Sequence, residues 1–590
     1  MNQTNNGHKN SCVNNLLAQQ APSRLHRKDA SLYGEFADEA EVGSFLGWVD
    51  LASNPPIALD ELDAIAKGIR LEGLDAVVLI GQGGSSQASM TTYSLYEVSK
   101  GCDVALYTLD SLSPVVVNHV LQASDPTRTL YIVSSKSGST IEPLMLERVV
   151  WQYVAGILGS KAAAQRFVAI TDPGSKLEQM ALVKDYRFVL SSPADVGGRF
   201  SALCVFALFP AACIGIDIKQ VVAIAASMEH RCTQDSTDNP AVDLACFIYD
   251  NYQQGRDKIA FVMPQSGTSL GLWLEQLIAE STGKQGLGIL PYIEVDASLL
   301  QAPCDDRIII SYSVGHLEGF DASLQGFDPS IPVRHKSFDT IDELLGEFVV
   351  WEYTTALVGL LMKINPFDQP DVEDTKKRVR SLLLAGSDAK DASATASDTA
   401  SAEAEQADND YLEITFSEQD YVRSVRISKA LAQDLDVAPD EINVDLVLRT
   451  LLGSLKRNDY FALNAFLPFH RQGRSEALER MRNRVGSRLS VAACLEIGPR
   501  YLHSTGQLQK GGPNTGVFCY LSSDEANDIE IPDEDFTLGK LARTQAEGDF
   551  NALAARGRRA IQIHLASNDP ETLCRFADRF CLAVSAVSVP

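Results

Sequence analysis

Two regions of the chain alternate short apolar runs with longer stretches of helical periodicity. Between residues 70 and 192 the runs are "DAVVLIG", "DVALYTL", "TLYIVSS", "RFVAIT" and "YRFVLS". Between residues 257 and 313 they are "KIAFVMP", "LPYIEV" and "DRIIISYS". Continuous apolar strands separated by helices are typical of parallel sheets that are covered on both faces. The pattern therefore predicts two doubly wound α/β domains, with ligand sites at the carboxyl ends of their strands.

Composition suggests how the rest of the chain is divided. Residues 1–60 read as an irregular lead-in, and residues 61–220 and 221–384 as the two α/β domains. Residues 385–410 are rich in Ala, Ser and Asp and poor in apolar bulk, which is typical of a flexible linker. Residues 411–590 mix strand-like runs with helical stretches, and they predict a separate α/β or α+β domain.

Charge and cysteine usage narrow the range of partners and compartments. With 51 Lys and Arg against 77 Asp and Glu, the formal charge is −26. A field of that sign repels nucleic acid and anionic lipid, so we expect neither as a partner. We identify no apolar run near the roughly 20 residues of a membrane span and no apolar signal core, which favours the cytoplasm. The 11 cysteines lack CxxC spacing, which favours reduced thiols over disulfides or zinc.

The segment 131–143, "YIVSSKSGSTIEP", ends an apolar run with a concentration of small polar residues. Its polar positions are Ser134, Ser135, Lys136, Ser137, Ser139 and Thr140. Backbone N–H groups at a helix N-terminus bind anions, and hydroxyls and a lysine add further donors. One capping residue is enough for a plain helix start. The excess of donors therefore favours a seat for a phosphate monoester over a simple capping turn.

A second polar turn, "LIGQGGSSQAS", also follows an apolar run. Gly81, Gly83 and Gly84 permit a close backbone approach, and Ser85 and Ser86 supply hydroxyls. The turn lacks the Walker lysine and the dinucleotide spacing, so alone it is a weak signal. Two such turns in one sheet favour a sugar-phosphate cleft.

Three other stretches carry charged or amide side chains whose roles the residues alone leave open. Arg199 in "ADVGGRFSAL" is a surface residue, a cap of a sheet edge, or a cation that stabilises an oxyanion over a cleft. Gln276 and Glu280 in "LEQLIAESTGKQG" share a helix face, although a lone helical glutamate is usually solvated. Gln369 and Lys376 in "INPFDQPDVEDTKKRVR" lie near a helix start, where surface lysines are common.

Five of these motifs occur in an order and at separations that resemble the glucose-6-phosphate isomerase family. They are "LIGQGGSS", "SSKSGST", "GGRFSAL", "EQLIAESTGK" and "FDQPDVEDTK", and the resemblance covers roughly residues 40–384. It implies two sugar-isomerase-type α/β domains and interconversion of glucose 6-phosphate and fructose 6-phosphate through an enediolate. "GPRYLHSTGQLQKGGPNTGVF" resembles the isomerase portion of bifunctional transaldolase/glucose-6-phosphate isomerases. We expect no transaldolase activity, because the chain has no room for that barrel.

The resemblance also implies a role for each matched residue. Glu280 corresponds to the carboxylate that moves a proton between C2 and C1, Arg199 to the enediolate stabiliser, and Lys376 to a lysine of ring opening. Gln276 and Gln369 correspond to substrate contacts. The implied phosphate grip consists of Ser135, Lys136, Ser137 and Thr140, with help from Gly84 and Ser85. No metal or organic cofactor is implied, because one carboxylate can return the proton that it removed.

The family's ring-opening histidine has no match at its usual place downstream of the catalytic glutamate. His316 and His335 lie in that part of the chain, but their surroundings differ from the family pattern. His503 lies among glycines and polar residues, in a loop that either approaches a ligand or is merely structural. We predict that the C-terminal domain brings this loop to the isomerase cleft, within one chain or across a homodimer.

Two other functions are compatible with the phosphate-type turns. One is an isomerase of another phosphosugar, such as an aminosugar phosphate, and the set "GGRFSAL", "ESTGK" and "FDQP" argues against it. The other is a non-catalytic regulatory sugar-phosphate-binding module, which has no need of Glu280, Arg199 and Lys376 together. The family pattern has Trp-Gly where this chain has Pro370-Asp371, a departure that lies a short way before Lys376.

Overall fold

The structure is a computed structural model that describes residues 11–301, 304–315, 327–371, 378–379, 382–383, 410–416, 421–435, 437–438, 441–469 and 473–589. The described residues fall into two compact units. Unit 1 is drawn from Met1–Asp110, His119–Gln369 and His503–Leu508, and unit 2 from Ser111–Asn118, Pro370–Leu502 and Gln509–Pro590. The predicted linker, apart from Asp410, lies outside the described residues, as do Lys376 and His316. The predicted domain boundaries stay predictions.

The first sheet of unit 1 has five parallel strands in the order β2-β1-β3-β4-β5. They are β1 (Ala76–Gly81), β2 (Ala105–Leu109), β3 (Thr129–Ser134), β4 (Phe167–Thr171) and β5 (Phe188–Ser191). β1 and β3 are buried along their whole length, which explains why their sequences are continuously apolar. The winding direction reverses between β1 and β3, where Gly81 lies opposite Ser134. Ligands of doubly wound sheets bind at such a switch point, beyond the strands' carboxyl ends.

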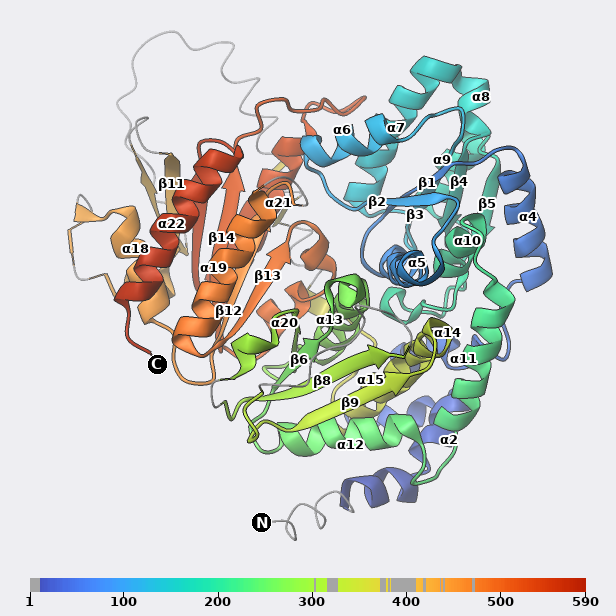
Figure 1. Cartoon of the computed structure of the whole chain (residues 1–590), viewed down its shortest axis with the longest axis horizontal. Helices are drawn as coiled ribbons and strands as arrows, with labels where there is room; N and C mark the ends of the chain where they lie inside the picture. Colours follow the sequence, from blue (N-terminus) through green and yellow to red (C-terminus); the bar gives the residue numbers. More distant parts are fainter. Residues whose placement is uncertain are drawn as a thin grey trace. The chain divides into compact units, whose positions relative to one another are not determined.

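The second sheet of unit 1 has four parallel strands in the order β7-β6-β8-β9. They are β6 (Lys258–Val262), β7 (Leu290–Glu294), β8 (Arg307–Val314) and β9 (Val333–Phe338). β9 was not expected from the sequence, because this edge strand alternates exposed and half-buried positions and reads "VRHKSF". Helix α12 (Pro240–Tyr252) lies beside β9, where Arg334 reaches Asp243 at 3.3 Å (Figure 1). Two doubly wound parallel sheets confirm the predicted fold class.

Helices cover both sheets and share one hydrophobic core. Helix α5 (Gln87–Lys100) is the first after β1, and helix α13 (Thr268–Thr282) is the first after β6. The two helices contact each other, because Oγ1 of Thr91 in α5 donates to the Ser269 carbonyl of α13 at 2.9 Å. This contact brings the carboxyl ends of the two sheets together. The other helices of this part of the chain are α2 (Ala21–His26), α3 (Glu39–Gly43), α4 (Leu59–Leu71), α6 (Pro114–Ala123), α7 (Ile141–Leu158), α8 (Ser160–Ala164), α9 (Lys176–Val183), α10 (Val205–Cys213) and α11 (Ile218–Cys232).

One helical stretch among the described residues, Ile341–Met362, is long and apolar enough to cross a membrane by length and composition. It comprises α14 (Ile341–Leu345) and α15 (Glu347–Met362). The sequence reading found no such run, since Asp342, Glu347 and Glu352 interrupt it. In the structure 94% of its apolar window is buried inside the protein, as expected for the central helix of a core.

Unit 2 contains a six-stranded mixed sheet in the order β10-β11-β15-β14-β12-β13. β11 runs antiparallel to both of its neighbours, and β12 to β15 are mutually parallel, so the fold is α/β. Helices α19 and α22 lie side by side on one face (Figure 1). The strands are β10 (Tyr411–Thr415), β11 (Val422–Ser428), β12 (Tyr460–Phe466), β13 (Ala492–Ile497), β14 (Gly516–Ser523) and β15 (Arg559–Leu565), and the helices are α17 (Lys429–Ala432), α18 (Val444–Gly453), α19 (Arg474–Leu489), α20 (Gly506–Gly511), α21 (Leu538–Ala555) and α22 (Pro570–Ala586).

Alternation along β14 shows how the two faces of this sheet differ. Val517, Cys519 and Leu521 belong to the apolar core that α18, α19 and α22 cover. Tyr520 points to the opposite face, where its ring meets that of Phe550 in α21 at 5.9 Å. Successive side chains of a strand alternate between the faces, so α21 covers the more polar side of the sheet.

Candidate active site

The turn after β3 holds the predicted phosphate seat. Thr140 is the N-cap residue of α7, yet its side chain makes no capping hydrogen bond. Oγ of Ser135 is buried and has no hydrogen-bond partner among the described residues. Buried hydroxyls are almost always paired in folded proteins, so an unused one at a helix N-terminus indicates a place for a ligand. The geometry therefore favours an anion seat over a simple capping turn.

Lys136 is already engaged by the protein. Its Nζ donates to Oδ2 of Asp172 at 2.6 Å and to the carbonyl of Ala194 at 3.0 Å. The hydroxyls of Ser137 and Ser139 lie 2.9 Å apart and pair with each other. The ammonium thus braces the turn against the segments that follow β4 and β5. In this arrangement the neutral donors, rather than the lysine, are left for an anion.

The glycine-rich turn after β1 is the point where the separate motifs meet. A Cβ added to Gly84 would lie 1.9 Å from the carbonyl oxygen of Gly198, so only glycine fits there. A Cβ on Gly83, whose φ is +55°, would lie 2.8 Å from Nε2 of Gln276 and 3.0 Å from Cβ of His503. Ser85 is buried, and its carbonyl accepts from Oγ of Ser134 at 2.8 Å. Backbone contact this close explains the paired glycines in the sequence.

Arg199 is buried, so it is not a surface residue. Nε donates to Oγ of Ser281 at 2.8 Å, and Nη1 donates to Oε1 of Gln369 at 3.0 Å. Nη2 donates to the carbonyls of Pro366 at 2.7 Å and Asp368 at 2.9 Å. Burial lowers the pKa of the guanidinium, and the carboxylates of Glu280 and Asp368 oppose that shift. These bonds fix the plane of the cation.

Glu280 and Gln276 lie on one buried face of α13, as the helical spacing predicts. Both residues are 4% exposed. Oε2 of Glu280 accepts from Nε2 of Gln276 at 3.3 Å and lies 3.6 Å from Nη1 of Arg199. Oε1 of Gln276 has no hydrogen-bond partner in the described part of the chain. A buried carboxylate beside a fixed cation and an unused amide oxygen is an arrangement suited to proton transfer on a polar ligand.

Lys284 is a member of this cluster that the sequence reading missed. It is buried, and its Nζ donates to the carbonyls of Asn365 at 2.5 Å and Asp368 at 2.6 Å and to Oδ1 of Asp368 at 2.5 Å. Burial, with the charge of Arg199 beside it, lowers the pKa of Lys284 to about 7. The motif "ESTGK" contained the residue, but it read as the end of a helix. Lys284 and Arg199 together hold the turn that carries Gln369.

His503 belongs to unit 1, within the segment His503–Leu508. Its Nε2 lies 3.1 Å from Oε1 of Glu142, a buried residue in the first turn of α7, directly after the phosphate-type turn. Nε2 of Gln507 donates to the carbonyl of Gly283 at 3.0 Å, and a Cβ on Gly283 would lie 2.4 Å from Cα of Leu508. The histidine thus lies beside the same turns as Arg199 and Glu280. Glu142, in "STIEP", was not expected to contribute.

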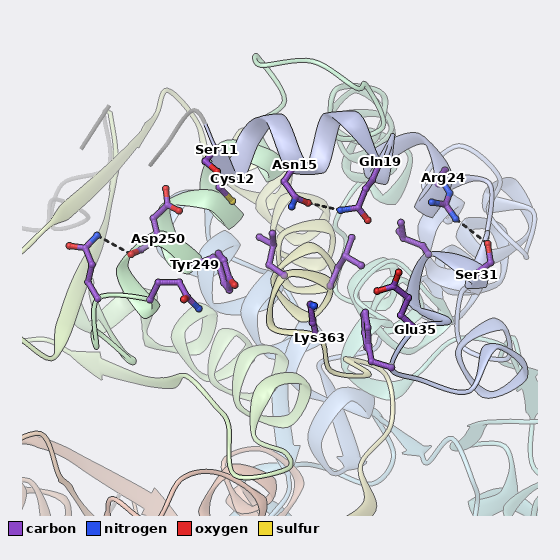
Figure 2. Close-up of a pocket in the computed structure, with 16 residues that line it drawn as sticks. Ser11, Cys12, Asn15, Gln19, Arg24, Ser31, Glu35, Tyr249, Asp250 and Lys363 are labelled. Atoms are coloured by element: carbon purple, nitrogen blue, oxygen red, sulfur yellow. Dashed lines mark hydrogen bonds between the residues drawn. The ribbon is translucent and has the colours of Figure 1, made fainter. Parts of the chain in front are cut away.

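One pocket among the described residues lies apart from this site. A pocket of about 1000 Å³ in unit 1 is lined by residues that include Cys12, Tyr249, Asp250 and Lys363, and by none of the predicted site residues (Figure 2). In the described part of the chain no group of three or more His, Cys, Asp or Glu side chains could hold a metal ion. The candidate active site remains the cluster of residues where the two sheets of unit 1 meet.

Several known proteins are similar to part of this chain. The family model described as phosphoglucose isomerase matches residues 62–288. A probable glucose-6-phosphate isomerase from Methanococcus maripaludis is 29% identical over 63% of this chain and 92% of its own length. Glucose-6-phosphate isomerases from Acholeplasma laidlawii and Methanocaldococcus jannaschii are 28% and 29% identical, over 58% and 52% of this chain and 90% and 84% of theirs. The chain is thus similar, over part of its length, to proteins named glucose-6-phosphate isomerase.

The matched stretch contains both polar turns, Arg199, Gln276, Glu280 and Lys284, and it ends before Gln369 and His503. A crystal structure of a hypothetical protein from Thermus thermophilus has the same fold, with a TM-score of 0.53 and 23% identity. The similarity covers 62% of this chain and 96% of the Thermus thermophilus chain. The family match therefore includes the whole first sheet of unit 1 and strand β6 of the second.

Proposed function

We propose that this chain is a glucose-6-phosphate isomerase that interconverts glucose 6-phosphate and fructose 6-phosphate in glycolysis and gluconeogenesis. The observation that carries the proposal is the buried pair of Arg199 and Glu280, 3.6 Å apart, beside the glycine-rich turn and Gln276. Its relatives bear that name, and the matched stretch contains this pair. A module that only binds sugar phosphates has no need to bury two opposite charges in this arrangement.

Aldose–ketose interconversion moves one proton between neighbouring carbons. The carboxylate of Glu280 removes the proton from C2 and returns it to C1, so one group acts as base and then as acid. Between the two transfers the substrate is an enediolate, and its negative charge is stabilised by Arg199. The guanidinium is held by Ser281, Gln369 and two carbonyls, so it needs no reorganisation when the charge develops.

The phosphate group is bound by the turn after β3. Ser135, Ser137 and Thr140 supply hydroxyl donors there, and the N-terminus of α7 supplies backbone N–H groups. Lys136 supports the turn through Asp172, and Gly84 and Ser85 complete the wall beside it. The donors are mostly neutral, which suits a dianion that must also leave with the product.

Ring opening is the role of His503 together with Glu142. The carboxylate of Glu142, 3.1 Å from Nε2, orients the imidazole. The imidazole moves a proton between the ring oxygen and the C1 hydroxyl. Lys376 keeps the ring-opening role that the motif resemblance implies for it.

We also propose a finer relationship from the motif resemblance. Residues 411–590 correspond to the end of the isomerase portion of the bifunctional transaldolase/glucose-6-phosphate isomerases, on the strength of "GPRYLHSTGQLQKGGPNTGVF". Transaldolase activity is not part of the proposal. We place the enzyme in the cytoplasm, with a sugar phosphate as its small-molecule partner and neither nucleic acid nor membrane as a partner.

The test is a turnover assay with purified protein. The chain should convert glucose 6-phosphate to fructose 6-phosphate, and Glu280→Gln should lower kcat by several orders of magnitude, because an amide cannot accept the C2 proton. Binding of a sugar-phosphate analogue to that variant should persist. Glu61→Gln, which neutralises an exposed carboxylate in α4, is the matched control and should leave kcat unchanged. Near-normal turnover in Glu280→Gln, or none in the unmodified chain, would overturn the proposal.

A further inference from the structure

A buried carboxylate in unit 2 bonds to residues on both sides of the segment that carries His503. Asp549, in the middle of α21, is completely buried. Its Oδ2 accepts from the hydroxyls of Tyr501 at 2.7 Å and Tyr520 at 2.6 Å, and its Oδ1 accepts from Nζ of Lys510 at 2.5 Å. A buried carboxylate with several short donors is rigid, because breaking any of these bonds leaves a polar group unpaired.

Two of those donors flank the His503–Leu508 segment in the sequence. Tyr501 comes two residues before His503, and Lys510 comes two residues after Leu508. One carboxylate therefore closes residues 501–510 into a loop whose two ends share an anchor. Burial and the charge of Asp549 raise the pKa of the Tyr501 and Tyr520 hydroxyls well above their usual value, so both remain donors at neutral pH.

Both ends of the loop have further contacts, and the ring of Tyr501 lies 5.8 Å from that of Phe466. Beyond Lys510, the guanidinium of Arg558 donates to the carbonyls of Lys510 at 2.7 Å and Gly512 at 2.6 Å. Next to Lys510, the amides of Gln509 and Asn464 bond at 2.9 Å. At the other end, the bond from Tyr501 to Asp549 is made only two residues before His503 in the sequence. Its loss should let His503 move while the rest of the domain stays folded.

We propose that Asp549 is a positioning residue for His503, acting through Tyr501 at one end of the loop and Lys510 at the other. This inference rests on the proposed function, because its consequence is seen only if His503 opens the sugar ring. A shift of about 1 Å in a catalytic group can cost about a hundredfold in rate, so a buried anchor several residues away controls the ring-opening step.

The experiment compares two substrates that differ in their need for ring opening. Glucose 6-phosphate is mostly cyclic, whereas a four-carbon aldose 4-phosphate cannot close a stable ring and reports proton exchange at C2 alone. His503→Ala should slow glucose 6-phosphate turnover about a hundredfold and change C2 proton exchange of the short substrate less than about threefold. Tyr501→Phe, which removes one hydroxyl, should reproduce that selectivity with a loss of about tenfold.

Tyr520→Phe is the matched control, because it removes an equally short bond to the same carboxylate from β14 and not from the loop. We expect it to slow glucose 6-phosphate turnover by less than about threefold, although losing this buried bond should lower the melting temperature about as much as Tyr501→Phe does. In a His503→Ala background, Tyr501→Phe should have no further effect, since a positioning residue acts only through the group that it positions. Asp549→Asn should show the same selectivity with a larger loss, if that variant folds.

Each outcome decides a different claim. If His503→Ala slows both substrates equally, the proposed ring-opening role of His503 fails, and with it this inference. If His503→Ala is selective but Tyr501→Phe is not, or if the two losses multiply in the double variant, the positioning role of Asp549 is wrong and the proposed function stands. Equal selectivity in Tyr501→Phe and Tyr520→Phe would also overturn the inference, because the anchor would then act on the whole domain.

Discussion

Two parts of the candidate site differ in how they use charged side chains. The serine turn, residues 134–140, offers mainly neutral hydroxyls and backbone N–H groups, and its lysine is paired with Asp172. The buried ion cluster, formed by Arg199, Glu280, Lys284 and Asp368, places four charged side chains together, and all but Asp368 are almost fully enclosed. The turn is adapted to bind and release a group, and the cluster is adapted to hold charges still.

The contrast follows from the cost of burying ions. A buried ion is tolerated only when its partners satisfy it, and Arg199 and Lys284 both donate to carbonyls of the turn at residues 365–368. Such a network cannot adapt to each ligand without breaking bonds. In the serine turn the unused Oγ of Ser135 can gain a partner at little cost to the protein. We therefore expect rigidity on the side proposed for proton transfer, and reversible binding on the side proposed for the phosphate.

The largest effect should come from disturbing the cluster at Arg199. Arg199→Lys keeps the charge but loses the planar fork that bonds Ser281, Gln369 and two carbonyls at once. We expect kcat/KM to fall by about 10²–10³-fold, mostly in kcat, because the fixed cation acts on the enediolate. Arg187→Lys, at the bridge to the half-exposed Glu72, is the matched control and should keep kcat/KM near that of the unmodified chain. A loss below about threefold in Arg199→Lys would contradict the assignment.

A smaller effect of a different kind should come from the serine turn. Ser135→Ala removes the unused buried hydroxyl, and a lost hydrogen bond to a charged group costs about 1.5–3 kcal/mol. KM should therefore rise by roughly tenfold or more, while kcat changes little. Steady-state kinetics and competition by inorganic phosphate measure the two quantities. Ser139→Ala, whose hydroxyl is exposed and paired with Ser137, should change KM less, and the opposite ranking would show that the phosphate binds elsewhere.

The comparison also explains what the sequence could predict. Continuous apolar runs identified β1, β3 and β6, because strands buried on both faces leave no polar positions to confuse the pattern. β9 was missed because an exposed edge strand carries polar side chains at most positions. In unit 2 no strand was predicted at Gly516–Ser523, although β14 forms there and is buried along its length. Burial on two faces therefore helps to identify a strand from its sequence but does not guarantee that it is found.

The candidate site could also be predicted only in part from the sequence. The serine turn is one contiguous segment, so its donors are visible in a single motif. The ion cluster joins Arg199, Glu280 and Asp368, which are far apart in the sequence, and no local pattern distinguishes Lys284 from a surface lysine at a helix end. His503 was chosen for its glycine-rich surroundings, and its neighbour Glu142 could be found only from the fold. Local motifs predict binding turns better than they predict buried charge networks.

Lys136 belongs to the serine turn but is paired like the charges of the ion cluster. Its removal should have a modest effect. Its ammonium is bound to Asp172 and the Ala194 carbonyl, so Lys136→Ala disturbs the turn's support and not a direct donor. We expect weaker sugar-phosphate binding, with KM raised about three- to fivefold, which is less than in Ser135→Ala. If Lys136→Ala raised KM far more than Ser135→Ala, the ammonium would be a direct phosphate ligand and the contrast with the ion cluster would fail.

The last prediction concerns the stability of the ion cluster and its dependence on pH. Burial and Arg199 lower the pKa of Lys284 from 10.5 to about 7, so between those values the unfolded chain binds more protons at this site than the folded chain. Stability then rises with pH in that window. Compared with Lys284→Met, the unmodified chain should gain about 1 kcal/mol in free energy of unfolding between about pH 7.5 and 8.5. The four tryptophans, Trp48, Trp151, Trp273 and Trp351, all lie in unit 1, so urea unfolding followed by their fluorescence reports on this unit alone. Lys219→Met provides the matched comparison: Lys219 is exposed, Asp60 raises its pKa, and it stays protonated in both states across this range, so its difference should be flat. A flat or falling difference for Lys284→Met would mean that Asp368 and the carbonyls keep the ammonium charged, and the ion cluster would then resemble an ordinary paired bridge.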